Sequence, residues 1–93
     1  MSTEVFAGKY AERFGFSSVD ALGLEDFFQA LELVAMKSKG FFLLKVDGER
    51  DRNIYTFALN MPAKDVVLRK DTDSIREGVL YIFSELERKN ILP

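Results

Sequence analysis

The residues of this chain that could do chemistry are its carboxylates, because its 93 residues include no Cys and no His. Without Cys there is no thiolate nucleophile, disulfide or Cys-ligated zinc. Without His, the usual general base near neutral pH and the commonest metal ligand are both missing. Fifteen Asp and Glu residues remain, but no pair stands in an apolar setting that would separate two carboxyl pKa values for acid–base catalysis. We therefore expect no catalytic residues, no cofactor and no enzymatic activity.

One acidic segment has the alternation of a calcium-binding loop. Asp47, Glu49 and Asp51 occupy every second position. A calcium loop needs Gly at its sixth position and Glu at its twelfth, and this segment has Arg52 and Ala58 there. The flanking segments also have the two-residue period of strands, not helices. We therefore expect a charged hairpin tip and no metal site.

The elements that carry these residues form one α+β domain over residues 1–93, since a chain of this length makes a single core. Apolar residues recur at helical spacing in the first and last thirds and with a period of two in the middle. This pattern predicts the order α-α-β-β-β-α, a three-stranded antiparallel meander with helices packed on it. The expected elements are helices over 3–14, 24–39 and 73–89 and strands over 41–46, 53–61 and 65–70.

Local signals mark the ends of these helices. Thr3 is the expected N-cap of the first helix, and Gly40 is the expected left-handed residue after the second. Ser74 and Glu77 have the spacing of a capping box for the last helix. Gly78 costs about 1 kcal/mol inside a helix, so we expect it to admit a close neighbour. The residues that we expect to be almost fully buried are Leu31, Phe57, Leu59, Val79, Ile82 and Leu86.

The strand over 41–46 is unusual because both of its faces are apolar. Phe42 and Leu44 point to one side, and Phe41 and Leu43 to the other. A sheet covered by helices on one side should alternate with polar residues outside, so something should cover the second face. Either the first helix wraps around to that side, or a second protein chain binds there. The interface candidates on this second face are Phe41, Leu43, Ile54, Ala58 and Val67.

Nucleic-acid binding is a less favoured alternative. Residues 37–70 carry a net charge of +4, and the predicted order of the last five elements is that of double-stranded RNA-binding domains. Such domains place a basic cluster at the start of the last helix. Here Arg69, Lys70 and Arg76 are interrupted by Asp71 and Asp73. Shared topology is also no evidence of shared function.

The remaining function classes are an interaction protein and a ligand-binding or regulatory domain. A high aromatic content of 13%, mild acidity and the missing catalytic residue types favour a small non-enzymatic protein that forms a homodimer or binds a larger protein. In size and charge it is comparable to immunity, antitoxin or chaperone proteins. A small-molecule or regulatory domain is the alternative, and it would need an apolar pocket with convergent polar groups. With no Cys, no signal-peptide pattern and no long apolar run, we expect a cytoplasmic protein without a membrane partner.

Overall fold

The computed structural model describes residues 2–93 and confirms the predicted α+β order. The three strands form one antiparallel sheet in the order β1-β2-β3, so β2 is central and β1 and β3 are its edges. Two short 3-10 helices, η1 and η2, lie in the connections. The elements are α1 (Thr3–Glu12), η1 (Val19–Ala21), α2 (Leu24–Ser38), β1 (Phe41–Val46), β2 (Tyr55–Met61), η2 (Pro62–Lys64), β3 (Val66–Thr72) and α3 (Ile75–Arg88).

Two of the expected helix caps are wrong by one residue. Ser2, and not Thr3, is the N-cap of α1, because its hydroxyl accepts a hydrogen bond from the Val5 amide at 3.3 Å. Lys39, with φ 54°, and not Gly40, is the left-handed residue that ends α2. Gly40 is required for a different reason: a Cβ at this position would collide with the backbone carbonyl of Asn60 on the neighbouring strand. Ser74 is the N-cap of α3 as expected, since its Oγ accepts from the Glu77 amide, but the reciprocal half of the capping box is absent, because the Glu77 carboxylate accepts from the Asp73 amide.

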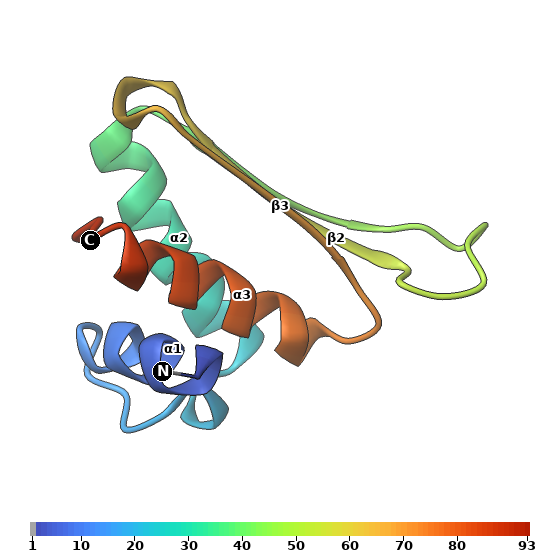
Figure 1. Cartoon of the computed structure of the whole chain (residues 1–93), viewed down its shortest axis with the longest axis horizontal. Coiled ribbons are helices and arrows are strands. Elements are labelled where there is room, and N and C mark those ends of the chain that lie inside the picture. The colour runs from blue at the N-terminus through green and yellow to red at the C-terminus, as the bar shows by residue number, and fades with distance from the viewer. Residues whose placement is uncertain (1) are drawn as a thin grey trace.

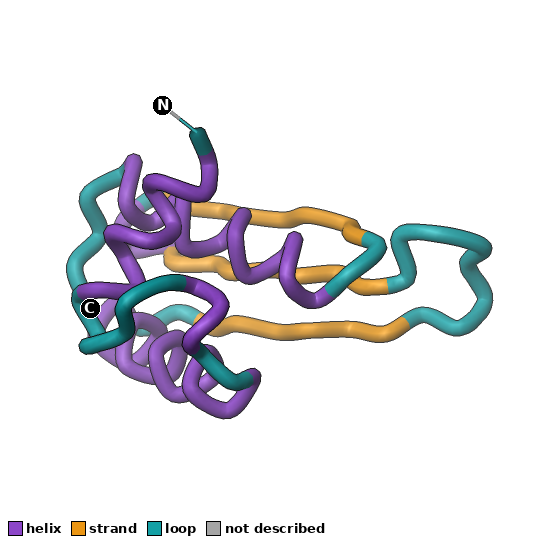
Figure 2. Tube along the Cα trace, turned by 90° about the horizontal axis from the view of Figure 1, so that it is seen from below, coloured by secondary structure: helices purple, strands orange, loops and turns teal. Residues whose placement is uncertain are grey.

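All three α-helices lie on one side of the sheet (Figure 1). On β2, the side chains of Phe57, Leu59 and Met61 point toward the helices. On β3, the side chains of Val66 and Leu68 also point toward the helices. All five residues are buried. Figure 2 shows the three strands side by side, with the loop between β1 and β2 extending beyond the helices. Within residues 2–93, the opposite face of the sheet therefore has no helix on it.

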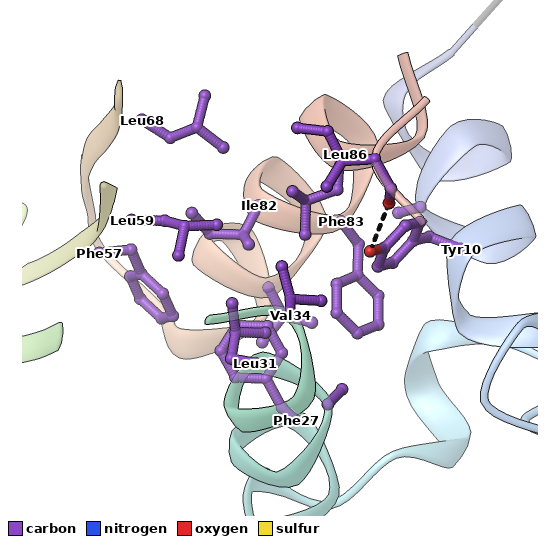
Figure 3. Packing of buried hydrophobic residues seen from close by; sticks show 14 of the residues in the cluster. Tyr10, Phe27, Leu31, Val34, Phe57, Leu59, Leu68, Ile82, Phe83 and Leu86 are labelled. Atoms are coloured by element: carbon purple, nitrogen blue, oxygen red, sulfur yellow. Dashed lines mark hydrogen bonds between the residues drawn. The ribbon is translucent and has the colours of Figure 1, made fainter. Parts of the chain in front are cut away.

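The core between the helices and the sheet is rich in aromatic rings (Figure 3). The Phe27 ring from α2 contacts the rings of Phe57 and Phe83, with centroids 6.1 and 5.4 Å away. Such edge-on and tilted pairs are the favoured arrangements of aromatic rings. All six residues expected in the core are buried: Leu31, Phe57, Leu59, Val79, Ile82 and Leu86.

The first helix does not cover the second face of the sheet, which corrects one of the two alternatives left open by the sequence. α1 packs against α3, on the side of that helix away from the strands (Figure 1). The buried Tyr10 hydroxyl donates a 2.8 Å hydrogen bond to the Ile91 carbonyl, and burial raises the pKa of this phenol. Arg13 forms a bidentate pair with Glu87 at 2.9 and 3.1 Å. These contacts fix α1 in a third layer, so the helix cannot reach the other face.

We expect truncation of the core leucines to destabilise the fold strongly. Leu31→Ala and Leu86→Ala each remove a buried side chain and leave a cavity, so each should lower the free energy of unfolding by about 2–5 kcal/mol. The matched control is Leu33→Ala, because Leu33 lies on the same helix as Leu31 but is 57% exposed, and its effect should stay within about 0.5 kcal/mol. Urea unfolding measures the free energy of unfolding of all three variants. Equal losses for Leu31 and Leu33 would show that the burial pattern of α2 is wrong.

Gly78 admits the close neighbour that the sequence indicated, because a Cβ there would overlap the ring of Phe57. Gly78→Ala should therefore destabilise the protein by about 1–3 kcal/mol through overpacking, despite the better helix propensity of Ala. Gly8, in α1, has nothing within 4 Å of the equivalent position, so Gly8→Ala should stabilise by about 0.5–1 kcal/mol. In thermal unfolding, Gly78→Ala should lower the melting temperature and Gly8→Ala should raise it. A stabilising effect of Gly78→Ala would contradict this packing.

Candidate functional site

The open face of the sheet is the side that carries no helix, and its residues are ordered by strand register. Antiparallel pairing aligns outward residues of the three strands in rows across the sheet. Three such rows span the face, and each takes one residue from β1, one from β2 and one from β3. The rows are Phe41–Asn60–Val67, Leu43–Ala58–Arg69 and Lys45–Thr56–Asp71.

The first two rows contain a cluster of exposed apolar side chains, here called the apolar patch: Phe41, Leu43, Ala58 and Val67. Phe41 is 53% exposed, Leu43 42% and Val67 74%, and Ala58 is half-buried between its neighbours. Asn60 lies between Phe41 and Val67. The structure thus brings together four of the five interface candidates predicted from the sequence.

Ile54 is the candidate that lies apart from the others. It precedes β2 by one residue and pairs with the base of the hairpin, where its carbonyl accepts from the Asp47 amide at 2.8 Å. Thr56, which lies between Ile54 and Ala58 on β2, is only 4% exposed. Ile54 is therefore excluded from the apolar patch.

The third row forms a polar cluster around the side chain of Arg50, which folds back from the hairpin loop. Arg50 Nη1 donates to Thr56 Oγ1 at 3.0 Å and lies 3.4 Å from Asp71 Oδ1. Its Nε is 3.3 Å from Asp47 Oδ2. Thr56 in turn donates to Asp71 Oδ1 at 2.6 Å. Arg50 thus covers Thr56 and closes one end of the open face with a hydrogen-bonded network.

This network lowers the pKa of the Asp71 carboxyl below its ordinary value. The Thr56 hydroxyl makes the largest contribution, because its hydrogen bond favours the ionised form. The positive charges of Arg50 and Arg69 act in the same direction. Asp71 is therefore an anion at neutral pH, held at the β3 edge of the face.

The acidic alternation of the hairpin does not assemble a cation site. Asp47 binds Arg50 and also lies 3.7 Å from Lys45 Nζ, and its Oδ1 accepts from the Glu49 amide. Within residues 2–93, no group of three or more acidic side chains has the geometry to hold a metal ion.

The basic residues around the start of the last helix contact groups of this same chain. Arg76 pairs with Asp20 at 2.7 Å and with Glu4 at 3.2 Å. Lys70 Nζ lies 5.8 Å from the centroid of the Tyr81 ring. Arg69 Nη2 lies 3.8 Å from Asp71. These side chains do not gather into one basic surface.

A small hollow lies on the helical side of the molecule, between η1, the start of α2 and α3. Its volume is about 200 Å³, and its walls include Val19, Leu22 and Val79. Arg76 and Asp20 stand at this hollow and bind each other, so they present no free polar pair to a ligand.

We compared the chain with models of protein families, with curated proteins and with solved structures, and none of the three comparisons found a match. No helix in the part of the chain that the structure describes combines the length and the apolar character that crossing a membrane requires.

The alternation of β2 places Thr56, Ala58 and Asn60 on one face, so part of this site could be predicted from the sequence. Arg50 was missed, because a loop side chain that returns to the sheet leaves no periodic signal. Arg69 and Asp71 lie two residues apart on β3, and Lys45 lies two residues after Leu43 on β1. This period of two was the available sign that they share the face with Val67 and Leu43.

We expect the Asp71 carboxyl to titrate below the ordinary aspartate pKa of about 3.9. A lowered folded-state pKa stabilises the fold above the unfolded-state value, and this contribution is lost as the pH falls through the folded-state value. Thr56→Val removes the hydroxyl donor, so the Asp71 pKa should rise toward its ordinary value. Carbon-detected NMR of the side-chain carboxyls measures this, and Thr3→Val, on α1, is the control. An ordinary pKa in the wild-type protein would contradict the network.

Proposed function

We propose that this protein works by association and forms a homodimer through the open face of its sheet. The main support for this proposal is the apolar patch. Phe41, Leu43 and Val67 are exposed together on the one side of the sheet that no described helix covers. Contiguous exposed apolar patches commonly mark interaction sites.

The physical gain comes from removing these side chains from water. A large exposed aromatic residue is a typical anchor of a protein interface. Phe41 supplies this anchor, with Leu43 two residues along the same strand and Val67 in the same row. Ala58, on the central strand between them, adds a small apolar side chain.

A second copy of the chain is the simplest partner that such a face fits. Two sheets pack face to face about 10 Å apart, with side chains of both faces in one layer. A patch that meets its own copy closes as a twofold pair, which is the commonest oligomer.

The small size of the face indicates a weak interface. Three strands of about six residues give a footprint of about 14 by 20 Å, or about 300 Å² in projection. Standard interfaces bury about 800 Å² on each partner. We therefore expect a micromolar dissociation constant and a monomer–dimer exchange that depends on concentration.

The proposal is tested with Phe41→Asp, which places a charge in the apolar patch. Sedimentation velocity from ~10 to ~500 µM should show the wild type shifting from monomer to dimer, as a micromolar interface requires, while Phe41→Asp stays monomeric. Far-UV circular dichroism should be unchanged. Leu33→Asp is the matched control, because Leu33 is similarly exposed but lies on α2, and it should dimerise like the wild type.

Two results would overturn the proposal. One is a wild type that remains monomeric across the whole concentration range. The other is normal dimerisation of Val67→Asp, a second variant whose exposed position protects it from unfolding if Phe41→Asp fails to fold.

A further inference from the structure

The two edges of the open face carry opposite charges at matching positions. Lys45 on β1 and Asp71 on β3 occupy the same row, on either side of Thr56. Beyond the other end of the apolar patch, Lys39 lies in the left-handed turn before β1 and Asp65 in the left-handed turn before β3, and both are exposed. The β1 edge is thus basic at two positions where the β3 edge is acidic, and between these positions β3 also carries the exposed Arg69, which lies 3.8 Å from Asp71.

A twofold dimer of two such faces has two simple arrangements. If the axis runs along the strands, β1 of one copy lies over β3 of the other and each row meets its own copy. If the axis runs across the strands, each strand lies over itself in the reverse direction. The charges at the two edges distinguish the arrangements.

We propose that the axis runs along the strands, so that β1 packs over β3 of the second copy. This inference rests on the proposed homodimer. Phe41 then meets Val67 of the second copy, Leu43 meets the aliphatic part of Arg69, whose guanidinium lies beside Asp71 of its own chain, and Lys45 meets Asp71. Each of these contacts occurs twice, once on each side of the axis, and Asn60 and Ala58 lie beside their own copies near it.

The arrangement across the strands brings like charges together. When its axis is centred on the apolar patch, Phe41 faces Leu43 of the second copy. The same shift places Lys45 near Lys39 and places the carboxylates of positions 71 and 65 near each other. Juxtaposed like charges are strongly disfavoured at an interface, so the edge pattern selects the arrangement along the strands.

Asp71 is able to accept the additional partner. Its contacts with Thr56, Arg50 and Arg69 are closest at one oxygen, Oδ1. In the described part of the chain, no hydrogen bond reaches Oδ2. The Lys45 side chain is 59% exposed and has only a loose 3.7 Å contact with Asp47, so its ammonium is free to reach across. Arg50 stays paired with Asp47 and Asp71, which balances its charge near the axis.

The test uses charge reversal at the two positions. Lys45→Glu alone places a carboxylate against Asp71 of the second copy twice, and Asp71→Lys alone places an ammonium against Lys45 of the second copy twice. Each variant should dimerise about tenfold more weakly than the wild type, as reversing two screened ion pairs implies. The difference should shrink at about 1 M NaCl, where charges are screened within about 3 Å.

Mixing the two variants separates an ion pair across the interface from damage to one chain. In the mixed dimer, the carboxylate introduced at position 45 of one chain meets the ammonium introduced at position 71 of the other. The second edge keeps the original pair of Lys45 and Asp71. An equimolar mixture should therefore associate nearly as well as the wild type, although each variant alone does not. Fluorescently labelled chains in sedimentation velocity report this mixed species directly, and Lys9→Glu on α1 is the control that should change nothing.

The outcomes distinguish this inference from the proposed function on which it rests. A wild type that stays monomeric contradicts both. A dimeric wild type whose Lys45→Glu variant associates more tightly contradicts the axis along the strands and supports the axis across them. Two weakened variants that do not recover on mixing also contradict the proposed pairing, while the homodimer itself stands.

Discussion

The packing of the Phe57 ring against Gly78 holds α3 directly against the central strand of the sheet. No side chain intervenes between α3 and β2 at this point, because a Cβ on residue 78 would overlap the ring. Phe27 from α2 packs on the same ring, and the ring centroid of Phe42 from β1 lies 6.2 Å from that of Phe57. Residues from two helices and two strands thus meet on one face of β2. The remaining helix, α1, packs outside α3 through contact between the Tyr10 and Phe83 rings, so the described helical cover is all on one side.

This one-sided arrangement gives the open face its division into two halves. At one end, Arg50 returns from the hairpin and satisfies the polar groups of Thr56 and Asp71. At the other end, Phe41 and Val67 flank Asn60 and both stay exposed. A polar end that leaves Lys45 exposed and one Asp71 oxygen open, beside an exposed apolar end, fits the proposed protein-binding surface.

The sequence predicted the directions of the strand side chains correctly, but it did not predict where α1 packs. The period of two in the strands placed Phe57 inward and Phe41 and Ala58 outward, because strand geometry fixes these directions. The position of α1 could not be predicted, since Tyr10 would be buried on either side of the sheet. Its actual place depends on the Ile91 carbonyl, a tertiary partner 81 residues away. The return of the Arg50 side chain to the sheet depends in the same way on the loop backbone.

In the proposed dimer, the open faces of two copies meet with β1 over β3. This arrangement is tested most directly by isotope-filtered nuclear Overhauser spectroscopy on an equimolar mixture of carbon-13-labelled and unlabelled chains. This dimer predicts contacts between the Phe41 ring protons of one chain and the Val67 methyl protons of the other. Within one chain the central strand β2 separates these two residues, so the signal reports the interface. If the intermolecular contacts were confined to the helices, the proposed dimer would be wrong. The same holds if no intermolecular contacts were seen at concentrations that give a dimer.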